Sequence, residues 1–77
     1  MEDLKKFYEM SSVAWKFFKD NYIELKSTDD IEAFWKKAIA DSKTLGEKYN
    51  NNHFINHMLY TMTEELYEYN KKSNKSN

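Results

Sequence analysis

The sequence predicts an all-α fold, a three-helix bundle, and three observations carry that prediction. The chain has no proline and a single glycine, Gly46, so it lacks the residues that usually form the turns of β-hairpins. Its apolar residues recur at three- and four-residue spacing in three segments, which is typical of amphipathic helices. Short polar segments separate them. The predicted helices cover about residues 2–22, 28–49 and 53–71.

The first predicted helix, residues 2–22, is unusually rich in apolar residues. Glu2 and Asp3 lie in its first turn, where carboxylates favour the helix dipole. Its apolar side chains sweep roughly 220° of the circumference, whereas an ordinary surface helix needs about 100–140°. They are Leu4, Phe7, Tyr8, Met10, Val13, Ala14, Trp15, Phe17, Phe18 and Tyr22. This helix therefore carries more apolar surface than a small bundle can cover.

A connector over residues 23–27 is expected to lead into the second helix. Ser27 or Thr28 is the expected N-cap, because a hydroxyl can accept from the first free backbone amides. Apolar residues then continue at helical spacing to Tyr49, and only Gly46 is discordant. Gly46 either ends the helix early or allows a neighbouring helix to approach closely. The register up to Tyr49 favours close approach.

The residues Asn50–Asn52 form the clearest break in the pattern. Asparagine tolerates the left-handed conformation at a helix end and is also a good N-cap. The third helix is expected over residues 53–71. Its predicted buried stripe is Phe54, Ile55, Met58, Leu59, Met62, Leu66 and Tyr69. Residues 73–77 contain no apolar side chain and are expected to form a disordered polar tail beyond one domain, residues 1–72.

Composition argues against several classes of function. The 12 basic residues are all lysine and the net charge is −1, a poor basis for sequence-specific nucleic-acid binding. No cysteine is available for a disulfide or a thiolate zinc site. No apolar run approaches the ~20 residues that span a bilayer, and the acidic start does not resemble a secretory signal. We therefore expect a cytoplasmic protein that binds neither membranes nor specific nucleic-acid sequences.

The residues that could carry chemistry form only weak patterns. His53 and His57 have the i, i+4 spacing of two metal ligands, and Glu64 follows about two turns later. Phe54 occupies the position where the metalloprotease pattern has a glutamate. Two solvated histidines are the preferred interpretation, and a metal-binding protein is the alternative. The acidic cluster formed by Glu64, Glu65 and Glu68 is interpreted as a solvated helix face. No catalytic residue and no cofactor is predicted.

The strongest functional feature is an apolar seam of the first helix, formed by Met10, Val13 and Phe17. The other two predicted helices have stripes of ordinary width and do not obviously cover these three residues. Two interpretations stay open. Either the first helix is central and uses both of its sides inside the bundle, or the seam is an intermolecular contact. We favour the intermolecular contact as a working hypothesis.

Four further aromatic residues allow two interpretations each. Tyr60 and Tyr67 lie seven residues apart, outside the main stripe of the third helix. They either flank the core or line a contact surface, where tyrosine is enriched. Trp15 and Trp35 are expected to be core residues, and the alternative is an aromatic cage around a ligand.

The order of these features resembles a loose group of small helical proteins of prophages and mobile elements in low-GC Gram-positive bacteria. The resemblance covers most of residues 4–68. It is carried by Trp15-Lys16-Phe17-Phe18-Lys19, Thr28-Asp29-Asp30 before Phe34-Trp35, Glu47-Lys48-Tyr49-Asn50-Asn51, and Phe54, Leu59 and Glu65-Leu66. It implies an accessory protein in a bacterial or phage-infected cell, acting against host defence. No activity carries over from the group.

Together these observations predict a non-enzymatic binding protein. It would self-associate or dock onto a host protein through the first helix, and it would inhibit that protein by occlusion. Two alternatives stay open. One is an oligomer that sequesters a small nucleotide signal between protomers, and the other is the metal-binding protein that uses His53 and His57.

Overall fold

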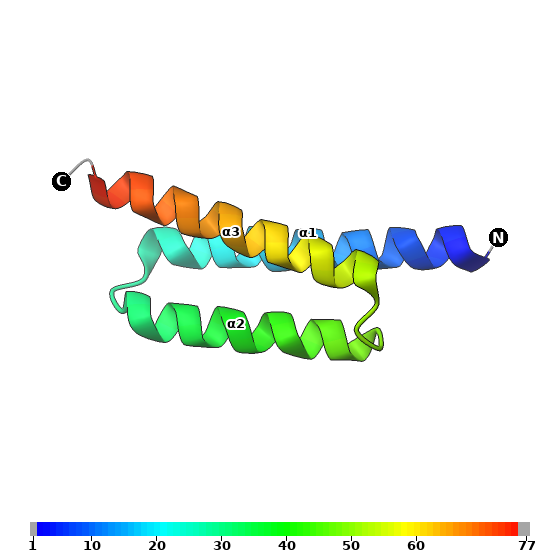
Figure 1. Ribbon diagram of the computed structural model, residues 1–77. Helices are drawn as coiled ribbons and strands as arrows, with labels where there is room; N and C mark the ends of the chain where they lie inside the picture. Colours follow the sequence, from blue (N-terminus) through cyan, green and yellow to red (C-terminus); the bar gives the residue numbers. More distant parts are fainter. Residues whose placement is uncertain (1, 76–77) are drawn as a thin grey trace.

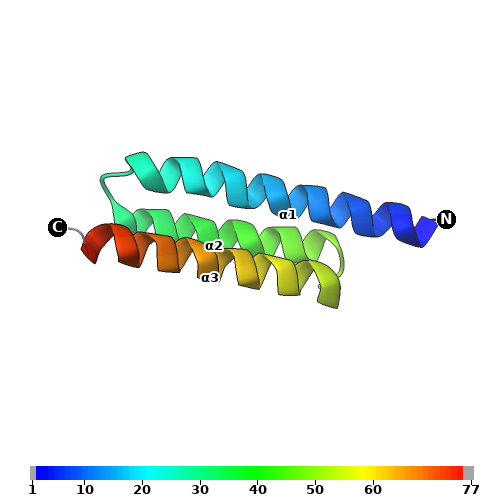
Figure 2. The same cartoon turned by 90° about the horizontal axis from the view of Figure 1, so that it is seen from above.

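The chain folds as an up-down-up bundle of three helices. The computed structural model describes residues 2–75, with side chains for residues 4–72, and it confirms the predicted all-α three-helix bundle. The helices are α1 (Glu2–Ser27), α2 (Ile31–Lys48) and α3 (His53–Lys75). α1 and α3 run side by side in the same direction, and α2 runs in the opposite direction along both of them (Figure 1, Figure 2). The bundle is a rod of 49 × 19 × 17 Å.

α1 is longer than predicted. The expectation of a connector over residues 23–27 is wrong, because these residues continue α1 for more than a turn. The segment contains no residue that breaks a helix, and Leu25 extends the buried side of α1. At the end of α1, the Glu24 carbonyl oxygen accepts from the backbone N–H of Thr28, at 2.9 Å, and from the Ser27 hydroxyl, at 3.3 Å.

The start of α2 shows a second difference from the prediction. Asp30 is the N-cap, and not Ser27 or Thr28: its side chain accepts from the backbone N–H of Ala33, at 3.0 Å. Because α1 extends to Ser27, only three residues join the helices, and the cap must be the residue directly before Ile31. The backbone N–H of Asp30 donates to the Thr28 hydroxyl, at 3.3 Å, which orders this short connection.

Replacing Asp30 by alanine should lower the free energy of unfolding by about 1 kcal/mol, because the N–H of Ala33 loses its acceptor. Asp29→Ala is the matched control, since Asp29 is exposed and does not cap α2. Urea denaturation followed by circular dichroism measures both changes. Equal losses of unfolding free energy for the two variants would show that negative charge near the start of α2, and not the hydrogen bond from Ala33 to Asp30, stabilises the protein.

The connection between α2 and α3 follows the prediction from the asparagine triplet. Asn50 and Asn51 have φ angles of 58° and 55°, in the left-handed region. The backbone N–H of Asn51 donates to the Gly46 carbonyl oxygen at 2.8 Å, which closes α2. The Asn52 side chain accepts from the N–H of Phe54 at 2.8 Å, which opens α3.

Gly46 allows α3 to lie close to α2. α2 continues through Gly46 to Lys48, and a Cβ atom at Gly46 would collide with the side-chain oxygen of Asn56 on α3. The interpretation of an early helix end is therefore wrong, and the contact with the Asn56 side chain agrees with the preferred interpretation of close approach. α3 continues to Lys75, past its predicted end at Lys71, and the remaining tail residues Ser76 and Asn77 lie outside the described residues.

Two apolar clusters form the core along the rod. The first contains Met10, Ala14, Phe17, Ile55 and Leu59. The second contains Leu25, Phe34, Ala38 and Leu66. The first cluster joins α1 to α3, and the second joins all three helices.

The prediction that Met10 and Phe17 are left uncovered is wrong. Met10 is 1% exposed and Phe17 5% exposed, while Val13 is half-buried. Ala14 lies between them and is fully buried, because its small side chain lets α3 come close to α1 on this side. The central interpretation of α1, which the sequence left open, therefore describes these residues better than the intermolecular one.

Candidate functional site

Five of the exposed apolar side chains, Leu4, Phe7, Tyr8, Trp15 and Phe54, gather where α1 and α3 meet on the outside of the bundle, whereas Ile23, Ile39, Tyr60 and Tyr67 are exposed elsewhere. Leu4, Tyr8 and Trp15 of α1 are 66%, 74% and 57% exposed. The prediction that Trp15 is a core residue is therefore wrong. We call this surface the aromatic face and define it as Leu4, Phe7, Tyr8, Trp15, Phe18, Tyr22, Phe54 and Tyr69.

Ring contacts order the aromatic face. Trp15, Phe18 and Tyr22 form a stacked row along α1, with centroid separations of 6.0 and 6.2 Å. The row crosses to α3 where the rings of Tyr22 and Tyr69 lie 4.9 Å apart. Such contacts hold the rings in place while their outer surfaces stay exposed to solvent.

The aromatic face and the core use two parallel seams of the same helix. Leu4, Tyr8, Ser11, Trp15, Phe18 and Tyr22 alternate steps of four and three residues, the repeat of a helix that packs against another helix. The core seam through Met10, Ala14 and Phe17 has the same repeat and is turned by roughly 120°. The surplus apolar surface predicted from the sequence therefore exists, on the side opposite to the one expected.

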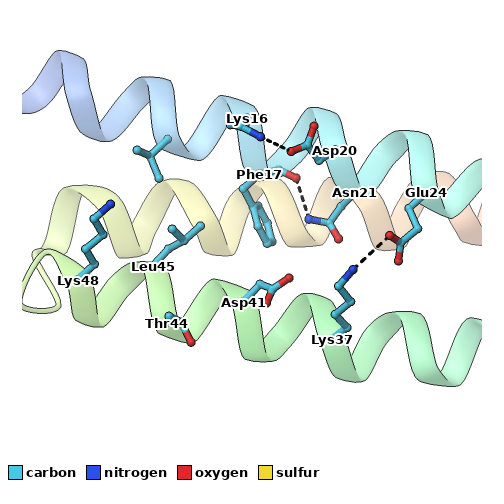
Figure 3. Close-up of a pocket in the computed structure, with 11 residues that line it drawn as sticks. Lys16, Phe17, Asp20, Asn21, Glu24, Lys37, Asp41, Thr44, Leu45 and Lys48 are labelled. Atoms are coloured by element: carbon cyan, nitrogen blue, oxygen red, sulfur yellow. Dashed lines mark hydrogen bonds and ion pairs between the residues drawn. The ribbon is translucent and has the colours of Figure 1, made fainter.

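Val13, the half-buried residue of the predicted seam, lies in a groove between α1 and α2. The groove has a volume of about 480 Å³. Val13, Phe17 and Leu45 form its apolar floor (Figure 3). Phe17 is itself buried, so the open apolar surface of this groove comes mainly from the half-buried Val13 and Leu45.

Charged side chains of both signs border the groove. Lys16 and Asp20 of α1 are 2.8 Å apart, and Lys37 of α2 lies 3.4 Å from Glu24 (Figure 3). The hydrogen bond from Lys16 lowers the pKa of the exposed Asp20 carboxyl, so the carboxylate stays charged at pH values below the ordinary range of an aspartate. Carboxylates beside Lys16 and Lys37 oppose the binding of a phosphate group and leave Lys48 as the lysine of this groove outside the two ion pairs, so the groove does not favour a nucleotide ligand.

Tyr60 and Tyr67 border a depression between α2 and α3. They are 64% and 56% exposed, and the Tyr67 ring lies 6.1 Å from Trp35. Trp35 is half-buried and packs against the second core cluster, as a core residue would. The two tyrosines thus flank the core and keep one side open. Whether they contact a partner stays a prediction.

The structure brings His53 and His57 together and adds no third ligand. Their ring centroids are 5.5 Å apart and both are exposed, as is Glu64. Within the described residues no group of three histidine, cysteine, aspartate or glutamate side chains is placed to hold a metal ion. The two imidazole rings are therefore neighbours on one face of α3, without a third ligand among the described residues.

Comparison with known proteins yields no match. No family model, no curated protein and no solved structure matches this chain. The resemblance to small prophage proteins therefore stays a prediction. In the described part of the chain, no helix combines the length and the apolar character needed to cross a membrane.

Proposed function

We propose that the chain is a non-enzymatic protein-binding module and that the aromatic face is its contact surface. The observation that carries the proposal is the exposure of Leu4, Tyr8 and Trp15 beside a core that is already complete. Exposed apolar patches of a few hundred Å² usually mark interaction sites on small proteins.

The composition of the face supports this proposal. Aromatic residues are enriched in protein interfaces, because rings with few torsions bury a large area at a low entropy cost. Ring stacking along α1 further restricts Trp15 and Phe18 before any partner arrives. A surface that is ordered in advance loses less entropy on binding.

A module of this kind acts by covering part of its partner. Inhibition of a partner by occlusion needs only a contact surface and no catalytic group. In the described residues, no charged or polar side chain is buried in the way that acid–base catalysts often are.

Site-specific photo-crosslinking in cells that express the chain tests the proposal. A photoreactive phenylalanine at Tyr8 should give a discrete protein adduct, because the side chain lies within the contact. The matched control places it at Tyr60, which is similarly exposed on another side of the bundle. If Tyr8 and Tyr60 give the same adducts, or neither gives any, the aromatic face is not a specific contact surface.

A further inference from the structure

Resting on the proposed function, we propose that the partner of the aromatic face is a second copy of this chain. The two copies would pair about a two-fold axis parallel to the helices. α1 of each copy then lies on α3 of the other, and four helices enclose the aromatic rings. Three features favour this pairing: the charges that border the face, the register of α1 and α3, and the exposed apolar area.

The two borders of the aromatic face carry opposite charges. On α1, Lys19 lies roughly 40° beyond Trp15, on the side away from α3, and Lys5 and Lys26 lie along the same border. On α3, Glu65 and Glu68 are exposed and lie within about 40° of Phe54 by helical angle, and both also border the depression that Tyr60 and Tyr67 line. Among the described residues, neither Lys19 nor these two glutamates belongs to an ion pair.

The register of the helices places these charges at the same level. Phe7 contacts Phe54 and Tyr22 contacts Tyr69, with the same separation in sequence. α1 and α3 therefore run in step, and Lys19 lies at the level of Leu66, between Glu65 and Glu68. A two-fold axis parallel to the helices keeps this level, so Lys19 of one copy meets Glu65 and Glu68 of the other.

The opposite arrangement brings like charges together. With the axis perpendicular to the helices, α1 would lie antiparallel on α1 of the second copy, and the border of Lys5, Lys19 and Lys26 would face itself. In the parallel arrangement only Lys26 and Lys72 share a level, at one end of the face. Complementary charges in the middle of the face therefore favour the dimer in which α1 of one copy packs on α3 of the other.

The area of the face is sufficient for a weak dimer. Aromatic side chains bury about 150–250 Å² each, so the exposed fractions of Leu4, Phe7, Tyr8, Trp15 and Phe54 amount to roughly 500 Å² per copy. Two copies would bury about 1,000 Å² in total, the lower end for a specific interface. A net charge of −1 per chain adds almost no repulsion between copies.

Sedimentation equilibrium of the purified chain, from about 1 to 200 μM, tests the pairing. We expect a reversible dimer with a micromolar Kd. Lys19→Glu should weaken it at least about tenfold, because a glutamate then faces two glutamates. The triple variant Lys19→Glu, Glu65→Lys, Glu68→Lys should restore it, because the charges are exchanged across the same contact. Lys43→Glu on exposed α2 is the matched control and should leave the Kd unchanged.

Three outcomes would overturn the pairing. These are a monomer over the whole concentration range, a Lys19→Glu variant that dimerises more tightly, and a triple variant that stays monomeric while circular dichroism shows it folded. A tighter Lys19→Glu dimer would indicate the arrangement in which α1 of one copy packs on α1 of the other, because that arrangement brings the lysines together. A monomeric chain whose Tyr8 still crosslinks to another protein in cells would remove the dimer and leave the protein-binding function in place.

Discussion

Replacing Phe17 by alanine is expected to lower the free energy of unfolding by about 3–5 kcal/mol. Phe17 is 5% exposed and belongs to the first core cluster, together with Met10 and Ile55. Its ring also forms part of the floor between α1 and α2, so the alanine leaves a cavity that the helices cannot close without moving. A chain of this size has a total stability at the low end of about 5–15 kcal/mol, so the variant should be barely folded at room temperature.

Trp15→Ala is the matched comparison, because it removes a larger ring from the same helix two residues earlier. The Trp15 side chain is 57% exposed and its described ring contact is the stack on Phe18. The loss of the Trp15 ring should lower the free energy of unfolding by about 1 kcal/mol. Urea denaturation at a protein concentration below the expected dimer Kd measures both variants. Equal losses would mean that Trp15, and not only Phe17, supports the fold of the single chain.

The number and order of the helices were predictable because they depend on local signals. The four-three spacing of apolar residues and the asparagine triplet each act within a few residues. The junction between α1 and α2 was not predictable to the residue. Ser27, Thr28 and Asp30 are all good N-caps, and the choice among them depends on how far α1 extends along the rod.

The amount of apolar surface on α1 was predictable, but its direction was not. Both seams of α1 have the same repeat and similar apolar content, so the sequence alone cannot say which one faces inward. Ala14 is the residue that decides. It lets α3 approach on the seam of Met10 and Phe17, whereas Trp15 on the other seam would hold a neighbouring helix farther away.

A glutamate introduced at residue 66 or at residue 67 should distinguish the buried side of α3 from its exposed side, because these neighbouring residues differ in burial. Leu66 is 0% exposed in the second core cluster, next to Phe34 and Ala38, and Tyr67 is 56% exposed. Leu66→Glu removes a buried leucine, at about 2–5 kcal/mol, and adds the cost of a buried charge of several kcal/mol. We expect this variant to be unfolded at pH 7.5. Tyr67→Glu loses only its contact with Trp35 and should stay folded.

The pH dependence of Leu66→Glu gives a second test of the same burial. Burial raises the pKa of the new carboxyl in the folded state above its unfolded value of about 4.3. The folded state then binds more protons than the unfolded state between these two pKa values, so stability falls as the pH rises through that range. Helical circular dichroism should therefore be partly recovered at about pH 4 relative to pH 7.5. Wild type and Tyr67→Glu, measured at both pH values, correct for the titration of the native carboxylates. A Leu66→Glu variant that is equally folded at both pH values would place residue 66 in contact with water and contradict the packing of α3 against α2.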